Sequence, residues 1–168
     1  YLAMDYVPWL TLQSLVQEAP LGPSRVARIG AAVLTALRSM HDRSMVHRDI
    51  KPANIFFDED ESGNVKVRIA DLGLWCTDAR ARPDGQKSLT GLEGISKTPG
   101  TLGYMSPEQM EPNGAVDARA DLHAVGSILW QLATARLPYP ARNREVRLRQ
   151  IVNVPARPEG MPTGLYSV

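Results

Sequence analysis

The chain has 168 residues, of which 43% are apolar, and this suffices for one domain with a buried core. Nineteen basic and eighteen acidic residues leave a formal net charge of +1, so no overall field indicates a nucleic-acid partner. One cysteine, Cys76, excludes an internal disulfide framework and fits a reducing compartment. No stretch reaches the roughly 18 apolar residues of a membrane span, so we expect no membrane contact within this segment.

The amino-terminal part of the sequence predicts a strand followed by a short helix. Residues 1–7 form an apolar strand-like run that ends at Pro8, which cannot continue a hydrogen-bonded ladder. Residues 11–18 are compatible with a helix that stops at the Pro20-Leu21-Gly22-Pro23 break. Because the sequence opens on Tyr1 inside an apolar run, without a charged leader, we expect it to be part of a longer protein.

The clearest helix of the sequence begins at Ser24. Its apolar residues recur at steps of three and four, while its arginines fall elsewhere, which is typical of one buried helix face. His41, at the end of this helix, could interact with the helix dipole, but a solvated histidine is the favoured interpretation. The predicted core face consists of Val26, Ile29, Val33, Leu34, Leu37 and Met40.

A polar turn between two short apolar runs comes next, at His47-Arg48-Asp49-Ile50-Lys51-Pro52-Ala53-Asn54. The runs at residues 45–46 and 55–57 predict two small strands that hold this turn from both ends. The turn places an acid, a cation and an amide within six residues. Because a base and a metal ligand need a rigid support, the pattern predicts a functional loop.

An acidic turn at residues 58–64 separates the second small strand from another one. The turn lacks the alternating ligands and the closing glutamate of a calcium loop, so a solvated hairpin turn is the better interpretation. Val65, Val67 and Ile69 then alternate with basic residues, which predicts a half-buried strand. This strand leads directly to Asp71-Leu72-Gly73.

The second half of the sequence predicts a long loop and two further helices. Residues 76–100 show no apolar period and are expected to form a surface loop, and residues 106–108 open a short helical turn. Residues 142–152 predict a basic amphipathic helix, whose arginines are better explained by a solvated face than by contact with nucleic acid. The last sixteen residues predict a loop. Between the 106–108 turn and the 142–152 helix, residues 117–135 predict a central buried helix with almost no polar face, carrying Leu122, Val125, Ile128, Leu129 and Leu132.

Taken together, the motifs resemble the carboxyl-terminal lobe of a eukaryotic-type (Hanks-type) Ser/Thr protein kinase. This resemblance implies an α+β fold, mainly α-helical, with small β hairpins that carry the catalytic and metal-binding loops. It also implies a partial kinase domain over residues 1–168, which holds the hinge and most of this lobe and is truncated after about residue 152. The motifs are His47-Arg48-Asp49 with Lys51 and Asn54, Asp71-Leu72-Gly73, Gly100-Thr101 through Ser106-Pro107-Glu108, and Asp121 with Gly126.

The resemblance assigns catalytic roles that suit phosphoryl transfer from ATP, a reaction that needs alignment and charge neutralisation more than covalent chemistry. Asp49 is the expected base for the substrate hydroxyl, and Lys51 supplies a cation near the transferred group. Asn54 and Asp71 are the expected Mg²⁺ ligands. Thr101 is expected to position the base and the lysine. The residues assigned to ATP are Met4, Asp5, Val7, Lys51, Asn54, Phe56 and Asp71.

Regulatory and structural roles follow from the same resemblance. Arg48 is expected to bind a phosphate on the segment between Asp71 and Glu108, because a guanidinium pairs with phosphate bidentately. Thr90 and Thr98 are the favoured phosphorylation sites on that segment. The expected structural residues are His47, Gly73, Glu108, Asp121 and Gly126.

The sequence departs from the family mainly by lacking its amino-terminal lobe. It contains no glycine-rich loop and no lysine in a Val-Ala-Ile-Lys context, which are the parts that contact the phosphates. The chain alone is therefore expected to transfer little phosphate. Leu72 replaces the usual Phe, and Thr11 stands where an acid often holds the ribose.

Two other classes compete with an active kinase. A pseudokinase would act as a binding or scaffold module, but it typically loses one of Asp49, Lys51, Asn54 and Asp71, which are all present. A small-molecule phosphotransferase should lack the Gly-Thr to Ser-Pro-Glu segment. The expected partners are proteins carrying Ser or Thr, including a second copy in trans, and the expected location is cytoplasmic. The segment Gly103–Gln109 is similar to bacterial members of the family.

Overall fold

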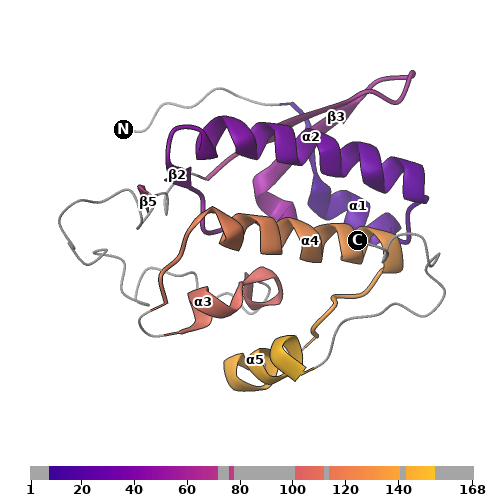
Figure 1. The fold of residues 1–168 in the computed structure, drawn as a ribbon. Coiled ribbons are helices and arrows are strands. Elements are labelled where there is room, and N and C mark those ends of the chain that lie inside the picture. The colour runs from indigo at the N-terminus through magenta and orange to yellow at the C-terminus, as the bar shows by residue number, and fades with distance from the viewer. Residues whose placement is uncertain (1–7, 72–75, 78–100, 112–113, 141–142, 154–168) are drawn as a thin grey trace.

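The computed structural model describes residues 8–71, 76–77, 101–111, 114–140 and 143–153. Two long helices, α2 and α4, lie side by side at the centre, with a small sheet on one side and α3 and α5 on the other (Figure 1). In the described part of the chain, no helix is both long and apolar enough to cross a bilayer. The elements are β1 (Leu10–Thr11), α1 (Leu12–Glu18), α2 (Pro23–His41), β2 (Met45–Val46), η1 (Pro52–Asn54), β3 (Ile55–Glu59), β4 (Val65–Ile69), β5 (Cys76–Thr77), η4 (Thr101–Tyr104), α3 (Pro107–Met110), α4 (Ala118–Thr134) and α5 (Arg144–Asn153).

Helix α2 follows the predicted apolar stripe, with one correction. Ile29, Val33 and Leu37 are fully buried, each contributing roughly 1.5–3 kcal/mol by leaving water. Leu34, in contrast, is 42% exposed, because the residue after Val33 is rotated about 100° around the helix axis. At Gly30, a Cβ atom would lie 3.0 Å from Leu129 Cδ1, so this glycine allows α2 and α4 to approach closely.

Helix α4 begins at a side-chain cap and contributes the other half of the core. The carboxylate of Asp117 accepts a hydrogen bond from Arg119 N, which satisfies a free amide of the first turn. Val125, Ile128 and Leu132 are buried against α2 and its neighbours. The prediction that this helix has almost no exposed face is wrong at Leu122, which is 46% exposed.

The strands form two separate antiparallel sheets, and this corrects the predicted arrangement around the 47–54 loop. β3 lies between β1 and β4 in one sheet, while β2 pairs with β5 in another. β5 falls at residues 76–77, where the sequence predicted only loop. The strands at the two ends of the 47–54 loop therefore do not form a hairpin with each other. The loop instead connects two sheets.

The β3–β4 hairpin turn agrees with the solvated turn predicted from the sequence. The Asp60 carboxylate accepts hydrogen bonds from the backbone amides of Ser62 and Asn64, at 3.0 and 2.9 Å, and from the Asn64 side chain. Gly63 adopts a φ of 78°, a value that favours glycine. The Asp60 carboxylate thus closes the turn by hydrogen bonds, whereas Glu59, at the end of β3, pairs with Arg25 and Arg28 of α2.

Helix α5 corrects the prediction that its arginines are solvated. Arg149 is exposed, whereas Arg147 is completely buried. The Arg147 guanidinium donates to Tyr139 O at 2.7 Å and to Met105 O at 3.3 Å. A buried cation is costly unless its donors are satisfied. Arg147 therefore attaches α5 to the rest of the domain through backbone carbonyl groups.

Candidate active site

Two polar side chains of the 47–54 loop, those of Lys51 and Asn54, converge on the carboxylate of Asp49. Asp49 is 6% exposed, and Lys51 Nζ donates to its Oδ2 atom at 2.7 Å. Asn54 Nδ2 donates to the same Oδ2 at 3.1 Å and to the Asp49 backbone oxygen at 2.9 Å. The short turn η1, with Pro52 at its first position, brings Asn54 back over Asp49. The acid, the cation and the amide that the sequence singled out therefore form one cluster.

His47 holds the loop in place through both of its ring nitrogens, which requires one tautomer of the imidazole. Its Nδ1 atom accepts the backbone N–H of Asp49 at 3.2 Å, so the ring proton lies on Nε2. Nε2 then donates to Ala70 O at 3.0 Å, and Ala70 N donates to Asn54 O at 2.9 Å. His47 is fully buried. These bonds attach the loop to the end of β4, immediately before Asp71.

Asp121 of α4 holds the loop from the other side. This carboxylate is 1% exposed and accepts the backbone N–H groups of His47 and Arg48, each at 2.9 Å. His41 Nε2 lies 2.9 Å from the same carboxylate, so the prediction that His41 is simply solvated is wrong. A buried carboxylate is costly unless it is well hydrogen-bonded. Asp121 meets that condition by binding the loop backbone.

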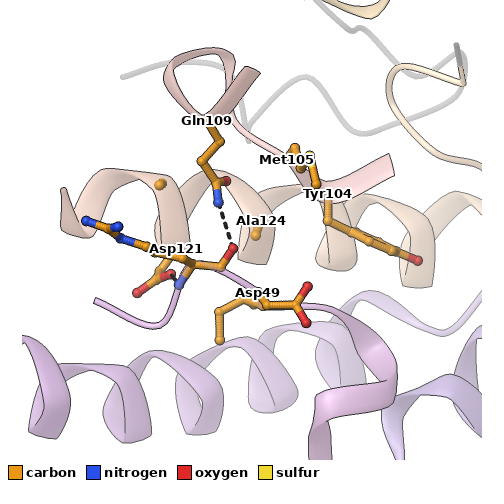
Figure 2. A pocket seen from close by; sticks show the side chains of 9 residues that line it. Asp49, Tyr104, Met105, Gln109, Asp121 and Ala124 are labelled. Carbon is orange, nitrogen blue, oxygen red and sulfur yellow. Dashed lines mark hydrogen bonds between the residues drawn. The ribbon is translucent and has the colours of Figure 1, made fainter. Parts of the chain in front are cut away.

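Helix α3, which begins within the Ser106-Pro107-Glu108 motif, packs over the loop through Gln109, a residue to which the sequence assigned no role. Helix α3 begins with a capping box between Ser106 and Gln109, in which the Gln109 side chain accepts from Ser106 N. The Gln109 amide also donates to Arg48 O at 2.6 Å, as Figure 2 shows. A small pocket lies here between the loop, α3 and α4, and its lining includes Asp49, Tyr104, Met105, Gln109, Asp121 and Ala124.

Buried polar groups also gather where α3, α4 and α5 meet. Burial lowers the pKa of Arg147 to about 10. Burial also lowers the pKa of His123, an effect that the Arg147 charge strengthens and the Glu108 charge opposes. The pKa of Tyr104 is raised by burial, and its hydroxyl donates to Gln131 at 2.7 Å. Tyr104 of η4 is thus bonded to α4, and Arg147 of α5 to backbone oxygens outside its helix; the sequence pattern predicted neither contact.

The two expected metal ligands present oxygen atoms of the kind that Mg²⁺ prefers. Since the Asn54 amide nitrogen is engaged by Asp49, its Oδ1 atom is the atom suited to a cation. Asp71 is exposed and adopts a φ of 64°, directly after the hydrogen-bonded Ala70. Among the described residues, no group of three or more His, Cys, Asp or Glu side chains is placed to hold a metal ion.

The other predicted site residues lie away from the Asp49 cluster or outside the residues that the structure describes. Phe56 is half-buried in β3, opposite Thr11 and Arg68, and Glu108 lies half-buried in the first turn of α3. Gly126 lies on an exposed face of α4, where a Cβ atom would meet none of the described residues within 4 Å. Thr101 opens η4, but its side chain is outside what the structure describes. Also outside are Met4, Asp5, Val7, Gly73, Thr90 and Thr98.

Comparison with known proteins relates the chain to one protein family. The model of the protein kinase domain family matches residues 1–161. The chain is 36% identical over 140 residues to the serine/threonine-protein kinase PknB of Mycolicibacterium smegmatis. This match covers 83% of this chain and 20% of that protein. It is 40% identical over 141 residues to the serine/threonine-protein kinase pkn3 of Myxococcus xanthus, with 83% and 24% covered.

A third relative, the probable serine/threonine-protein kinase CE0033 of Corynebacterium efficiens, is 39% identical over 140 residues. That match covers 83% of this chain and 19% of the relative. The chain thus spans about a fifth of the length of these curated relatives. These relatives are bacterial, as the Gly103–Gln109 segment indicated, and they confirm the resemblance to Ser/Thr kinases. Because the family model matches nearly the whole length of this chain, the chain belongs to the protein kinase family.

Proposed function

We propose that the protein containing this chain is a Ser/Thr protein kinase, which transfers the γ-phosphoryl group of ATP to Ser or Thr hydroxyls of proteins. In this proposal the chain supplies the hinge and most of the carboxyl-terminal lobe. The observation that carries it is the convergence of Lys51 and Asn54 on the buried Asp49 carboxylate. A match to a family alone would leave the chemistry open, whereas this cluster supplies the groups that phosphoryl transfer needs.

Asp49 acts as the base that orients the acceptor hydroxyl and accepts its proton. Both Lys51 and Asn54 bind the Oδ2 atom, and this fixes the plane of the carboxylate. The backbone around Asp49 is held by His47 and Asp121, so the carboxylate has little freedom to turn. Positioning of this kind is the main way in which proteins accelerate phosphoryl transfer.

Lys51 provides positive charge beside the acceptor and the transferred phosphoryl group. Its side chain is 19% exposed, so the ammonium group can contact both Asp49 and a bound phosphate. Thr101 is assigned to position Asp49 and Lys51. Arg48 is assigned to bind a phosphate at Thr90 or Thr98.

Asn54 through Oδ1 and Asp71 through its carboxylate would hold Mg²⁺ together with ATP. The metal neutralises the negative charge of the phosphates when it is bound. Asn54 keeps its oxygen available because its nitrogen is bound to Asp49. Phe56 is assigned to the apolar floor of the adenine site. The parts of a kinase that cover the phosphates do not occur in these 168 residues, so the chain alone should transfer little phosphate.

The test uses the full-length protein, ATP, Mg²⁺ and a generic protein acceptor. Asp49→Asn removes the base while keeping the shape of the side chain, and we expect kcat to fall about 100-fold or more. Asp58→Asn is the matched control, because Asp58 is an exposed acid of β3. It should leave kcat unchanged.

Unchanged phosphate incorporation in Asp49→Asn would refute the assigned mechanism. A wild-type protein that binds ATP but transfers no phosphate to itself or to the acceptor would instead support a pseudokinase. Binding is measured by titration with a fluorescent ATP analogue, so the two outcomes are separated in one set of samples.

A further inference from the structure

Gln109 makes three side-chain hydrogen bonds at a position where two distant segments meet. Its Oε1 atom accepts from Ser106 N at 3.1 Å and from Ser106 Oγ at 3.2 Å. Its Nε2 atom donates to the backbone oxygen of Arg48 at 2.6 Å. The side chain is 7% exposed, and Figure 2 shows it pointing from α3 toward the loop that carries Asp49. A short helix cap is thereby connected to the residue just before Asp49.

The Arg48–Asp49 peptide group is held at both of its polar atoms. Gln109 binds the carbonyl oxygen, and His47 Nδ1 accepts the N–H of the same peptide at 3.2 Å. Arg48 adopts a φ of 69°, a left-handed conformation that is unfavourable for a residue with a Cβ atom. Such a conformation persists when the surroundings determine it. Gln109 supplies the contact to the carbonyl side, and the orientation of that peptide sets the direction of the Asp49 side chain.

We propose that Gln109 is a positioning residue for phosphoryl transfer, which orients Asp49 by fixing the Arg48 carbonyl group and couples it to the Ser106 turn. This inference rests on the proposed function of Asp49. Gln109 itself contacts no reacting atom. Its effect should appear in the rate of the chemical step and not in nucleotide binding.

The role requires an amide side chain of this length. The contact to Arg48 O needs a donor, and the contacts to Ser106 need an acceptor in the same group. A methionine has a similar length but can neither donate nor accept in this way, so Gln109→Met leaves the half-buried Arg48 carbonyl without this partner. A glutamate retains the acceptor but places a carboxylate oxygen against the carbonyl oxygen. Both substitutions therefore remove the contact to the loop while filling the same space.

The experiment compares Gln109→Met with Ser106→Ala in the full-length protein. Ser106→Ala is the matched control, because it removes the Ser106 Oγ contact but leaves the contact from Nε2 to Arg48 in place. For Gln109→Met we expect kcat to fall about 10- to 100-fold, as misplacement of a reactive group does, with KM for ATP changed less than about twofold. Ser106→Ala should keep kcat within about threefold of wild type. Rates are taken well below each melting temperature and divided by the folded fraction.

A Gln109→Met protein with wild-type kcat per folded molecule would overturn the proposal, since a purely structural role predicts a lower melting temperature alone. Equal losses of kcat in Gln109→Met and Ser106→Ala would also overturn it. Asp49→Asn, run in parallel, separates this failure from a failure of the proposed function. Amide hydrogen exchange at Asp49 provides a readout without activity: faster exchange in Gln109→Met than in Ser106→Ala is expected, and equal exchange contradicts the proposal.

Discussion

Asp121 shows how much of the candidate site depends on a residue that has no part in the proposed reaction. Its carboxylate accepts N–H groups from His47 and Arg48 and lies beside His41 Nε2, while being almost completely buried. Substitution by alanine would leave these buried donors without this partner. We expect Asp121→Ala to lower the free energy of unfolding by about 3 kcal/mol, as the loss of one partner from a buried polar network does.

The measurement for Asp121 is urea denaturation of the full-length protein followed by circular dichroism. Asp42→Ala serves as the control, because the Asp42 side chain is 66% exposed at the end of α2. It should change stability by no more than about 0.5 kcal/mol. Equal effects of the two substitutions would show that the Asp121 contacts contribute little.

At the level of elements, the contact between α2 and α4 forms the core beneath the site. The buried and the exposed face of α2 can be compared directly. Leu37 is 1% exposed, whereas Leu34, on the same predicted stripe, is 42% exposed. Leu37→Ala should lower the free energy of unfolding by about 2–5 kcal/mol, because it removes buried apolar surface and leaves a cavity. Leu34→Ala should cost at most about 1 kcal/mol. Similar losses in denaturant titrations would mean that Leu34 is covered in the full-length protein.

The sequence predicted most elements here because their patterns are local. Each signal lies in the residues of the element itself or directly beside it: the apolar spacing of α2, the alternation of β4 and the capping residues of α3. The errors occur where a distant segment decides the outcome. Residues 76–77 form a strand only because β2 pairs with them. Arg147 is buried with Nη1 and Nη2 bonded to Tyr139 O and Met105 O and with Nε lacking a hydrogen-bond partner, and the periodicity of α5 contains no sign of these contacts.

For the whole molecule, the junction of α3, α4 and α5 predicts a dependence of stability on pH. Burial lowers the pKa of His123 below its ordinary 6.5, with Arg147 acting in the same direction and Glu108 against it. The unfolded chain therefore takes up a proton near pH 6.5 that the folded protein does not. This contribution to stability is retained above pH 6.5 and is lost as the pH falls toward the lower folded pKa.

Chemical denaturation of wild type and His123→Gln, from about pH 7 to about pH 5, measures this contribution. The chain has three histidines, and the other two are common to both proteins, so their titration cancels in the difference. The stability of wild type relative to the variant should decline as the pH falls. A constant difference would contradict the pKa shift of His123.

The sequence could group the polar residues of the candidate site, but it could not predict the contacts that hold their loop in place. Asp49, Lys51 and Asn54 stand within six residues, so a sequence reading can group them. The contacts from Asp121, Gln109 and Ala70 come from other elements and depend on how those elements pack. Asp121 was assigned a structural role through the family motif, whereas the contact from Gln109 to Arg48 carried no signal in the sequence.

The distance along the chain between Asp121 and the loop has a consequence for synthesis of the protein. The hydrogen bond from Arg48 N to Asp121 joins residues 73 positions apart. A growing chain thus contains its acid, its lysine and its amide long before it contains the carboxylate that orders them. Contacts this far apart form late, because the loop entropy between them has to be overcome first. The geometry of the loop should therefore be complete only after α4 has been made, and the proposed phosphoryl transfer could begin only then.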